Sequence, residues 1–220
     1  PLEVVHRDVS PSNLLVGYDG TLRVLDFGVA SARRRLHETA TGEVKGKFGY
    51  GSPEQLQGQR VDRRADIWSL GVVLWECLTG KRLFQRESLA ETVGAVTTAP
   101  IPPVRDEWPD APLELEEVVF RALNRDPERR FGSAREMGRA LLEALTDAGR
   151  SMTSADVAEW MADRFPDGES RHRRLRSPNA RPSVSGHLPH RPSSDPPSAA
   201  GEVVSVSAGV GRRRYAWLAA

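Results

Sequence analysis

The sequence contains a single cysteine, Cys77, among its 220 residues. One thiol excludes a framework of internal disulfide bonds and favours a reducing compartment such as the cytoplasm. The chain also lacks an N-terminal segment with the basic, apolar and small-residue order of a signal peptide. It does not begin with Met, so we expect a fragment or a processed product.

The net charge is only +1, but the charged residues are unevenly distributed along the chain. Residues 166–220 contain nine Arg and four Asp or Glu residues, which leaves 22 Lys and Arg against 26 Asp and Glu in residues 1–165. A mildly acidic body with a basic tail argues against a nucleic-acid-binding globule. Apolar residues make up 39% of the chain, enough for the core of one domain with appendages.

Long apolar runs are scarce, and the clearest one extends from Ala65 to Thr79 before Gly80. It is apolar nearly all round, which predicts a buried central helix that is too short to span a bilayer. Residues 86–98 indicate a weak surface helix, and apolar residues at helical spacing over 115–123 predict another.

Two N-terminal capping signals predict further helices. Ser133 with Glu136 forms a capping-box pattern before an apolar stripe, and Thr153 with Asp156 precedes a shorter one.

Short β-type runs flank polar residues near the start of the chain. These are Val4-Val5, Leu14–Val16 and Leu22–Leu25. Asp19-Gly20 separates the last two runs and is a strong hairpin signal, because Gly permits the positive φ that tight turns require.

Three polar side chains surround the open end of this hairpin. If the turn centres on Asp19-Gly20, Asn13 and Asp26 lie opposite each other, and Asp8 lies one loop away. Hard oxygen ligands suit Mg²⁺ better than Zn²⁺. Two carboxylates and a carboxamide in this arrangement indicate a site that holds metal ions and orients a hydroxyl nucleophile.

Residues 28–54 form a long polar segment without convincing periodicity. Long irregular segments within compact domains are usually functional. A solvated surface loop is the alternative.

Four motifs, in order and at family spacing, resemble the C-terminal lobe of a eukaryotic-like Ser/Thr protein kinase of the bacterial type. They are His6-Arg7-Asp8 with Asn13, Asp26-Phe27-Gly28, Ser52-Pro53-Glu54 and Asp66–Gly71. The resemblance implies a mainly α fold with a small β-hairpin, which is the C-lobe of the α+β kinase fold with the N-lobe absent.

The resemblance, which covers residues 1–146, and the composition of the remaining residues divide the chain into four parts. We expect the kinase C-terminal lobe over 1–146, a short helical extension over 147–165 and a disordered Pro/Ser/Arg-rich linker over 166–211. Residues 212–220 are basic and then aromatic. Two interpretations stay open for them: a frayed terminus, or the start of a truncated transmembrane segment that would anchor a cytoplasmic protein to the inner membrane.

The resemblance also implies roles for the residues at the hairpin end. Asp8 would orient the substrate hydroxyl and accept its proton. Asn13 and Asp26 would hold Mg²⁺, with Mn²⁺ as the alternative ion, against the phosphates of ATP. Leu15 would lie beneath the adenine.

Further residues would regulate or support this site in the family. Arg7 would bind a phosphorylated activation loop, in which Thr39 and Thr41 are candidate phosphosites. Three residues would have structural roles. Glu54 and Arg130 would form a buried ion pair, and Asp66 would brace the backbone of the catalytic loop.

Two positions depart from the family pattern. Ser10 stands where a Lys usually faces the γ-phosphate, and Lys47 stands where a Thr usually follows the Gly of the substrate-binding loop. We hypothesise an exchange in which Lys47 supplies the catalytic cation and Ser10 the hydroxyl. The alternative is an exposed loop charge beside an impaired site. Gly51 replaces a residue that is often large and apolar.

The sequence has no glycine-rich phosphate loop, no strand Lys with a helix Glu partner and no hinge. From the motifs we predict a Ser/Thr protein kinase that transfers phosphate from ATP to protein hydroxyls. Because the elements just named are missing, we expect little activity from this chain by itself. A catalytically inactive kinase-like lobe that binds other proteins is the alternative. Tyrosine specificity is disfavoured by Val9–Ser12, and a small-molecule phosphotransferase by Ser52-Pro53-Glu54.

Overall fold

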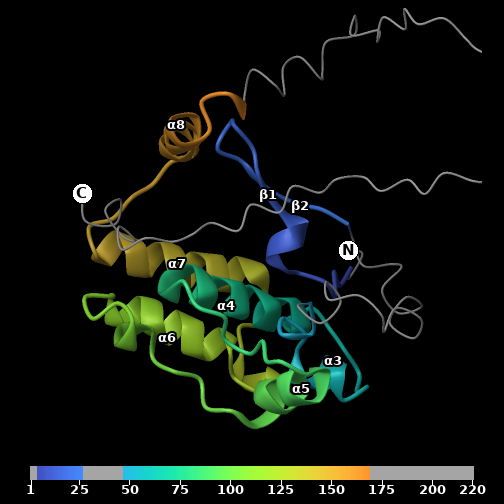
Figure 1. Ribbon diagram of the computed structural model, residues 1–220. Coiled ribbons are helices and arrows are strands. Elements are labelled where there is room, and N and C mark those ends of the chain that lie inside the picture. The colour runs from blue at the N-terminus through green and yellow to red at the C-terminus, as the bar shows by residue number, and fades with distance from the viewer. Residues whose placement is uncertain (1–3, 27–46, 169–220) are drawn as a thin grey trace, which may run out of the picture. The chain divides into compact units, whose positions relative to one another are not determined.

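A computed structural model describes residues 4–26 and 47–168 of the chain, all within one compact unit (Figure 1). Within these ranges the protein is mostly helical with a two-stranded antiparallel sheet, as expected. The α-helices are α3 Pro53–Leu56, α4 Arg64–Thr79, α5 Leu89–Thr98, α6 Leu113–Ala122, α7 Ala134–Asp147 and α8 Ser154–Arg164. The strands and 3-10 helices are η1 Pro11–Asn13, β1 Leu14–Val16, β2 Leu22–Val24, η2 Val104–Asp106 and η3 Pro127–Arg129.

The hairpin has its turn at Asp19-Gly20, but the predicted register is wrong by one residue. Leu14 pairs with Val24, and the backbone N–H of Leu25 donates to the carbonyl of Asn13 at 2.8 Å. Asn13 therefore lies opposite Leu25 rather than Asp26. The reason is the loop, which spans Gly17–Thr21 and is closed by a hydrogen bond from the N–H of Gly17 to the carbonyl of Thr21.

The predicted β-type run at Val4-Val5 is also wrong, because these residues adopt no strand. A strand is stabilised by a hydrogen-bonded neighbour. In the described part of the chain, the sheet contains β1 and β2 and no third strand.

Helix α4 is the central helix that the apolar run predicts. Gly80 ends it in the left-handed conformation, with φ +67°, and its N–H donates to Glu76. Trp68 and Val72 are fully buried on α4, whereas Cys77 lies on an exposed part of its surface. The helix is therefore mostly buried, as predicted, and the other residues of α4 are buried or half-buried.

The core lies where α4, α6 and α7 pack together, as Figure 1 shows. Gly71 permits the close approach of α4 and α6, because a Cβ at this position would lie 2.9 Å from the Cβ of Ala122. One cluster of buried side chains joins the three helices: Ile67, Val118, Ala122, Phe131 and Met137.

Capping residues set the starts of the peripheral helices. The predicted surface helix over 86–98 begins later, at Leu89, because Ser88 forms a capping box with Glu91. At α7 the predicted box is half formed, since Ser133 accepts from the N–H of Glu136, whose carboxylate accepts from Gly132 instead.

Helix α8 begins with the predicted capping box of Thr153 and Asp156. It lies beside the turn of the hairpin (Figure 1). Gly20 allows this contact, because a Cβ there would lie 1.8 Å from the carbonyl oxygen of Ser154. The positive φ of Gly20, +71°, favours glycine for a second reason.

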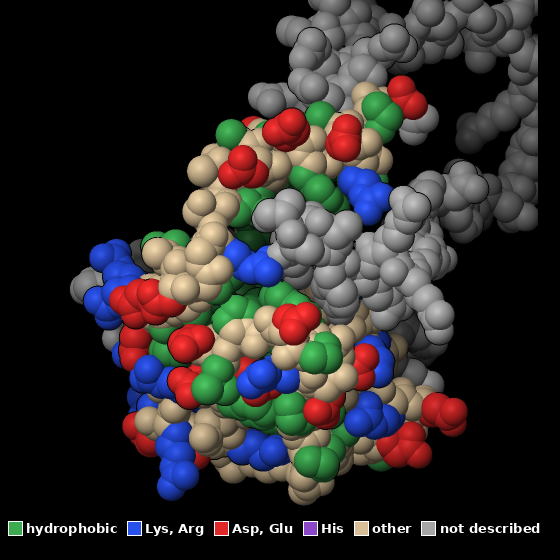
Figure 2. All heavy atoms as spheres, turned by 90° about the vertical axis from the view of Figure 1, so that its left-hand side faces the viewer, with side chains coloured by type: hydrophobic (Ala, Val, Ile, Leu, Met, Phe, Trp, Pro, Cys, Tyr) green, Lys and Arg blue, Asp and Glu red, His purple; other side chains and the backbone are tan. Residues whose placement is uncertain are grey.

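On the face shown in Figure 2, acidic and basic side chains are interspersed, with hydrophobic side chains between them. No helix of the described ranges is long and apolar enough to cross a membrane. The expected linker over 166–211, beyond its first three residues, and the basic end over 212–220 lie outside these ranges. Membrane anchoring and a cytoplasmic location stay predictions.

Candidate functional site

The loop His6–Asn13 is held to the first turn of α4 by one carboxylate. Asp66 accepts the backbone N–H of His6 through Oδ2 and that of Arg7 through Oδ1, both at 2.8 Å. Gln55 also donates to the carbonyl of Arg7 at 2.8 Å. Arg7 has a positive φ of +64°, which is unfavourable for a residue with a Cβ. These hydrogen bonds offset that cost, and Asp66 thus occupies the bracing position predicted for it.

His6 connects the same loop to the hairpin, and the sequence analysis gave it no role of its own. The N–H of Asp8 donates to Nδ1 of His6 at 3.3 Å. Because a backbone N–H can only donate, the proton of the ring lies on Nε2, which donates to the carbonyl of Leu25 at 3.0 Å. His6 is buried. Its place in the His-Arg-Asp motif is the sequence feature that could have predicted this role.

Asp8 is the point at which the candidate catalytic side chains meet. Asn13 donates through Nδ2 to the carbonyl oxygen of Asp8 at 2.7 Å and to its Oδ2 at 3.0 Å. Lys47 donates through Nζ to the same Oδ2 at 3.1 Å. The structure therefore brings together three predicted residues, one of them 39 positions away in the chain. Among the described residues, Oδ1 of Asp8 has no hydrogen-bond partner.

Ser10 does not join this group. It is buried, and its hydroxyl shares a hydrogen bond of 3.0 Å with that of Ser12. In the described ranges no hydrogen bond connects Ser10 with Lys47 or with a side-chain oxygen of Asp8. The structure places Lys47 where the exchange hypothesis requires a cation, but it does not bring the Ser10 hydroxyl to Asp8.

The proposed metal ligands offer two oxygen donors. Both hydrogens of the Asn13 amide are used on Asp8, so its Oδ1 is the atom left for a cation. Asp26 follows β2 and is exposed. No cluster of three or more His, Cys, Asp or Glu side chains suited to a metal occurs in the described ranges. Two oxygen donors fit Mg²⁺, which keeps water or phosphate oxygens as its other ligands.

The hairpin itself presents an aliphatic surface. Leu15, predicted beneath the adenine, lies on β1 and is 49% exposed. Other aliphatic side chains of the hairpin are also exposed, namely Val16, Leu22, Val24 and Leu25. A two-stranded hairpin is marginal unless its faces pack against something else, so this surface suits a ligand or further protein.

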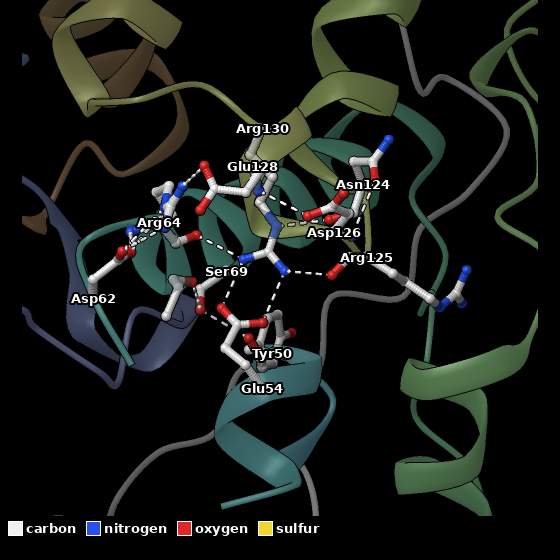
Figure 3. A network of polar contacts seen from close by, with 11 residues as sticks. Tyr50, Glu54, Asp62, Arg64, Ser69, Asn124, Arg125, Asp126, Glu128 and Arg130 are labelled. Carbon is white, nitrogen blue, oxygen red and sulfur yellow. Dashed lines mark hydrogen bonds and ion pairs between the residues drawn. The ribbon is translucent and has the colours of Figure 1, made fainter. Parts of the chain in front are cut away.

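Glu54 and Arg130 form the predicted buried ion pair (Figure 3). Nη1 and Nη2 of Arg130 each donate at 2.8 Å to one carboxylate oxygen of Glu54, and the two side chains are 0% and 7% exposed. Burial would raise the pKa of Glu54, but the hydrogen bonds and charge of Arg130 outweigh it and lower this pKa. The pair connects α3 to the chain after η3.

A second arginine lies beside this pair, and sequence reasoning missed it. Arg64 contacts Asp62 at 2.8 Å and Glu128 at 2.9 Å, and its backbone carbonyl accepts a hydrogen bond from Nη1 of Arg130 at 2.9 Å (Figure 3). Its hydrogen bonds lower the pKa of Asp62. The network therefore connects α3 and the start of α4 with η3 and the residue after it.

Several predicted residues lie outside the described ranges: Thr39, Thr41 and the Phe27-Gly28 part of the Asp-Phe-Gly motif. The predicted role of Arg7 toward a phosphorylated loop stays a prediction.

A family model of the protein kinase domain matches residues 2–141. The tyrosine-protein kinase MasK of Myxococcus xanthus is 48% identical over 147 residues, which cover 67% of this chain and 23% of MasK. The serine/threonine-protein kinase PknB of Mycolicibacterium smegmatis is 37% identical over 166 residues, covering 72% of this chain and 26% of PknB. The serine/threonine-protein kinase PrkC of Bacillus subtilis is 35% identical over 148 residues, covering 67% of this chain and 23% of PrkC. The chain thus spans about a quarter of the length of these relatives.

Proposed function

Because this chain belongs to the protein kinase family, we propose that it forms the C-terminal lobe of a Ser/Thr protein kinase domain. The reaction is transfer of the γ-phosphate of ATP to a hydroxyl of a protein substrate. The observation that carries the proposal is the convergence of Asn13 and Lys47 on one carboxylate oxygen of Asp8. Phosphoryl transfer requires mainly positioning and charge neutralisation from the protein, and this group offers both.

Each side chain has a distinct task in this proposal. Asp8 orients the substrate hydroxyl and accepts its proton, for which Oδ1 is available while Oδ2 is held by two donors. Lys47 places a positive charge beside the transferred phosphate. Asn13 and Asp26 hold Mg²⁺, which when bound neutralises charge on the phosphates of ATP. Leu15 offers an exposed aliphatic side chain to the adenine.

The choice of hydroxyl needs its own argument. PknB and PrkC are named serine/threonine-protein kinases, whereas MasK is named a tyrosine-protein kinase. We propose Ser/Thr specificity because Val9–Ser12 does not resemble the Arg- and Ala-containing loop of tyrosine kinases. Phosphoamino-acid analysis of the products tests this choice, and phosphotyrosine as the main product would refute it.

The catalytic proposal is tested by replacing Lys47 in the full-length protein. Lys47→Ala is expected to slow phosphate transfer roughly 100-fold, the usual effect of removing one preorganised group that stabilises transition-state charge. Lys47→Arg should recover part of the rate, because it keeps the charge. Single-turnover transfer of labelled phosphate from ATP, with Mg²⁺ and a protein acceptor, measures both.

Lys81→Ala is the matched control, since it removes the same charge from a Lys that pairs with Glu107 instead. It should retain the unaltered rate. If Lys47→Ala also retained it, Lys47 would be an exposed loop charge. If the unaltered full-length protein transferred no phosphate, the transfer rate of Asp8→Asn would be zero as well. A non-catalytic interaction module would then be the better interpretation.

A further inference from the structure

Lys47 lies at the start of a tight turn that carries it to Asp8. The N–H of Tyr50 donates to the carbonyl of Lys47 at 3.1 Å, and that of Gly51 to Phe48 at 3.2 Å. The side chain of Lys47 is 46% exposed, so little packing holds it in place. The position of its amine therefore depends on where the backbone of this turn is held.

Tyr50 holds the turn against α4 at two points. Its carbonyl accepts the hydroxyl of Ser69 at 2.8 Å, a contact visible in Figure 3. Its own hydroxyl donates to Oε2 of Glu76 at 2.7 Å. Tyr50 is buried, so its ring packs in one place and its hydroxyl requires a partner. Burial, followed by the contact with Glu76, raises the pKa of Tyr50 and keeps the hydroxyl a donor.

Glu76 is in turn fixed by groups that follow α4. Arg82 donates to Oε2 of Glu76 at 2.8 Å and also contacts the hydroxyl of Tyr50. The N–H of Leu83 donates to the other carboxylate oxygen at 3.1 Å. The carboxylate thus has several donors and a nearby positive charge, which makes it a stable anchor in a largely buried place.

In this chain the cation beside Asp8 is part of the turn that Tyr50 anchors, 37 positions after Ser10. A cation within the loop His6–Asn13 would keep its place whatever this turn did, because Asp66 fixes that loop independently. Lys47 has no such independence. When the turn docks on α4, it therefore also brings the positive charge of Lys47 to Asp8.

We propose that Tyr50 and Glu76 are positioning residues that hold Lys47 against Asp8, so that the site has its cation only while the turn Lys47–Gly51 is docked on α4. The inference rests on the proposed catalytic role of Lys47 and deepens it. Under this proposal, the rate of the phosphate-transfer step depends on whether the turn Lys47–Gly51 is docked on α4.

A double-mutant cycle in the full-length protein tests the coupling. Tyr50→Phe keeps the buried ring and removes the hydroxyl that reaches Glu76. We expect it to lower the transfer rate at saturating ATP and substrate about tenfold, as one hydrogen bond to a charged group is lost. In the Lys47→Ala background the same change should alter the rate less than about twofold, because the cation it positions is gone.

A readout that does not need activity accompanies the cycle. Brief acetylation with an amine-reactive ester, followed by mass spectrometry, reports how well each Lys is protected. Tyr50→Phe should increase acetylation at Lys47 several-fold, since the loosened turn releases its ion pair, while acetylation at Lys81 should stay unchanged and serves as the internal reference.

The outcomes separate this inference from the proposed function. If Lys47→Ala slows transfer but Tyr50→Phe leaves both the rate and the acetylation of Lys47 unchanged, the positioning role is refuted and the catalytic role stands. An equal loss from Tyr50→Phe in both backgrounds refutes it as well, because the effect would not pass through Lys47. If Lys47→Ala leaves transfer unchanged, the catalytic role fails and the positioning role fails with it.

Discussion

Glu54→Gln is expected to lower the free energy of unfolding by about 3 kcal/mol, because it leaves the buried guanidinium of Arg130 without its counter-charge. Breaking a buried ion pair by removing one partner typically costs about 3–5 kcal/mol. The structure indicates the lower end of this range. Arg130 also donates to the carbonyl oxygens of Asn124, Arg64 and Arg125, at 2.6, 2.9 and 3.2 Å, and these contacts remain.

Urea unfolding followed by tryptophan fluorescence measures this change. Trp68 is a suitable reporter, since the guanidinium carbon of Arg130 lies 5.1 Å from the centre of its ring. The matched control is Asp19→Asn, which removes the charge from a pair with Arg23 that is likewise bidentate but about half exposed. Solvent screens such a pair, so the control should match the unaltered protein. If Glu54→Gln were as stable as this control, the buried pair would not contribute as argued.

The pH dependence gives a second check on the same pair. The folded protein lowers the pKa of Glu54, so its contribution is fully present above the ordinary glutamate pKa of about 4.3 and is lost as the pH falls through the lower folded value. The difference in stability between the unaltered protein and Glu54→Gln should therefore be constant from pH 8 to about pH 5 and should shrink in stronger acid. A difference that grows on acidification would contradict the assigned direction.

Three further predictions follow from contacts in the fold. Gly20→Ala should cost more stability than Gly58→Ala, because both residues have a positive φ but a Cβ would meet α8 only at Gly20; comparing their urea midpoints tests this, and equal midpoints would contradict it. Gly71→Ala should lower the free energy of unfolding by about 1–3 kcal/mol, since its Cβ would lie 2.9 Å from that of Ala122, and a neutral effect would show that α4 and α6 separate easily. Asp66→Asn should slow phosphate transfer while the protein stays folded by circular dichroism, because an amide accepts through one oxygen and the carboxylate uses two; an unchanged rate would count against the bracing role.

Local features of the fold could be predicted because their causes lie close together in the chain. Gly80 ends α4 and Gly20 takes the positive φ of the hairpin turn, as their residue type indicates. Thr153 and Asp156 begin α8 as a capping box. In each case a few neighbouring residues satisfy their own backbone groups, so tertiary packing is not needed to specify the outcome.

Parts of the candidate site could also be predicted, through motifs rather than through contacts. The pairing of Glu54 with Arg130 and the bracing by Asp66 follow the resemblance to kinases, and the structure places these side chains accordingly. The hairpin register could not be predicted, because it depends on hydrogen bonds that close the loop Gly17–Thr21. Two registers that differ by one residue fit the sequence pattern of a short hairpin almost equally well.

The sequence by itself determined the family and the helical character of the chain, and it made Asp8 the candidate catalytic carboxylate, because these depend on residue type and spacing. Only the tertiary structure decided that Lys47 reaches Asp8 while the hydroxyl of Ser10 turns to Ser12. It likewise decided the anchoring of this region by Glu76, which no motif indicated. The physical reason is that these partners are far apart in the chain, and packing on α4 is what brings them within hydrogen-bond distance.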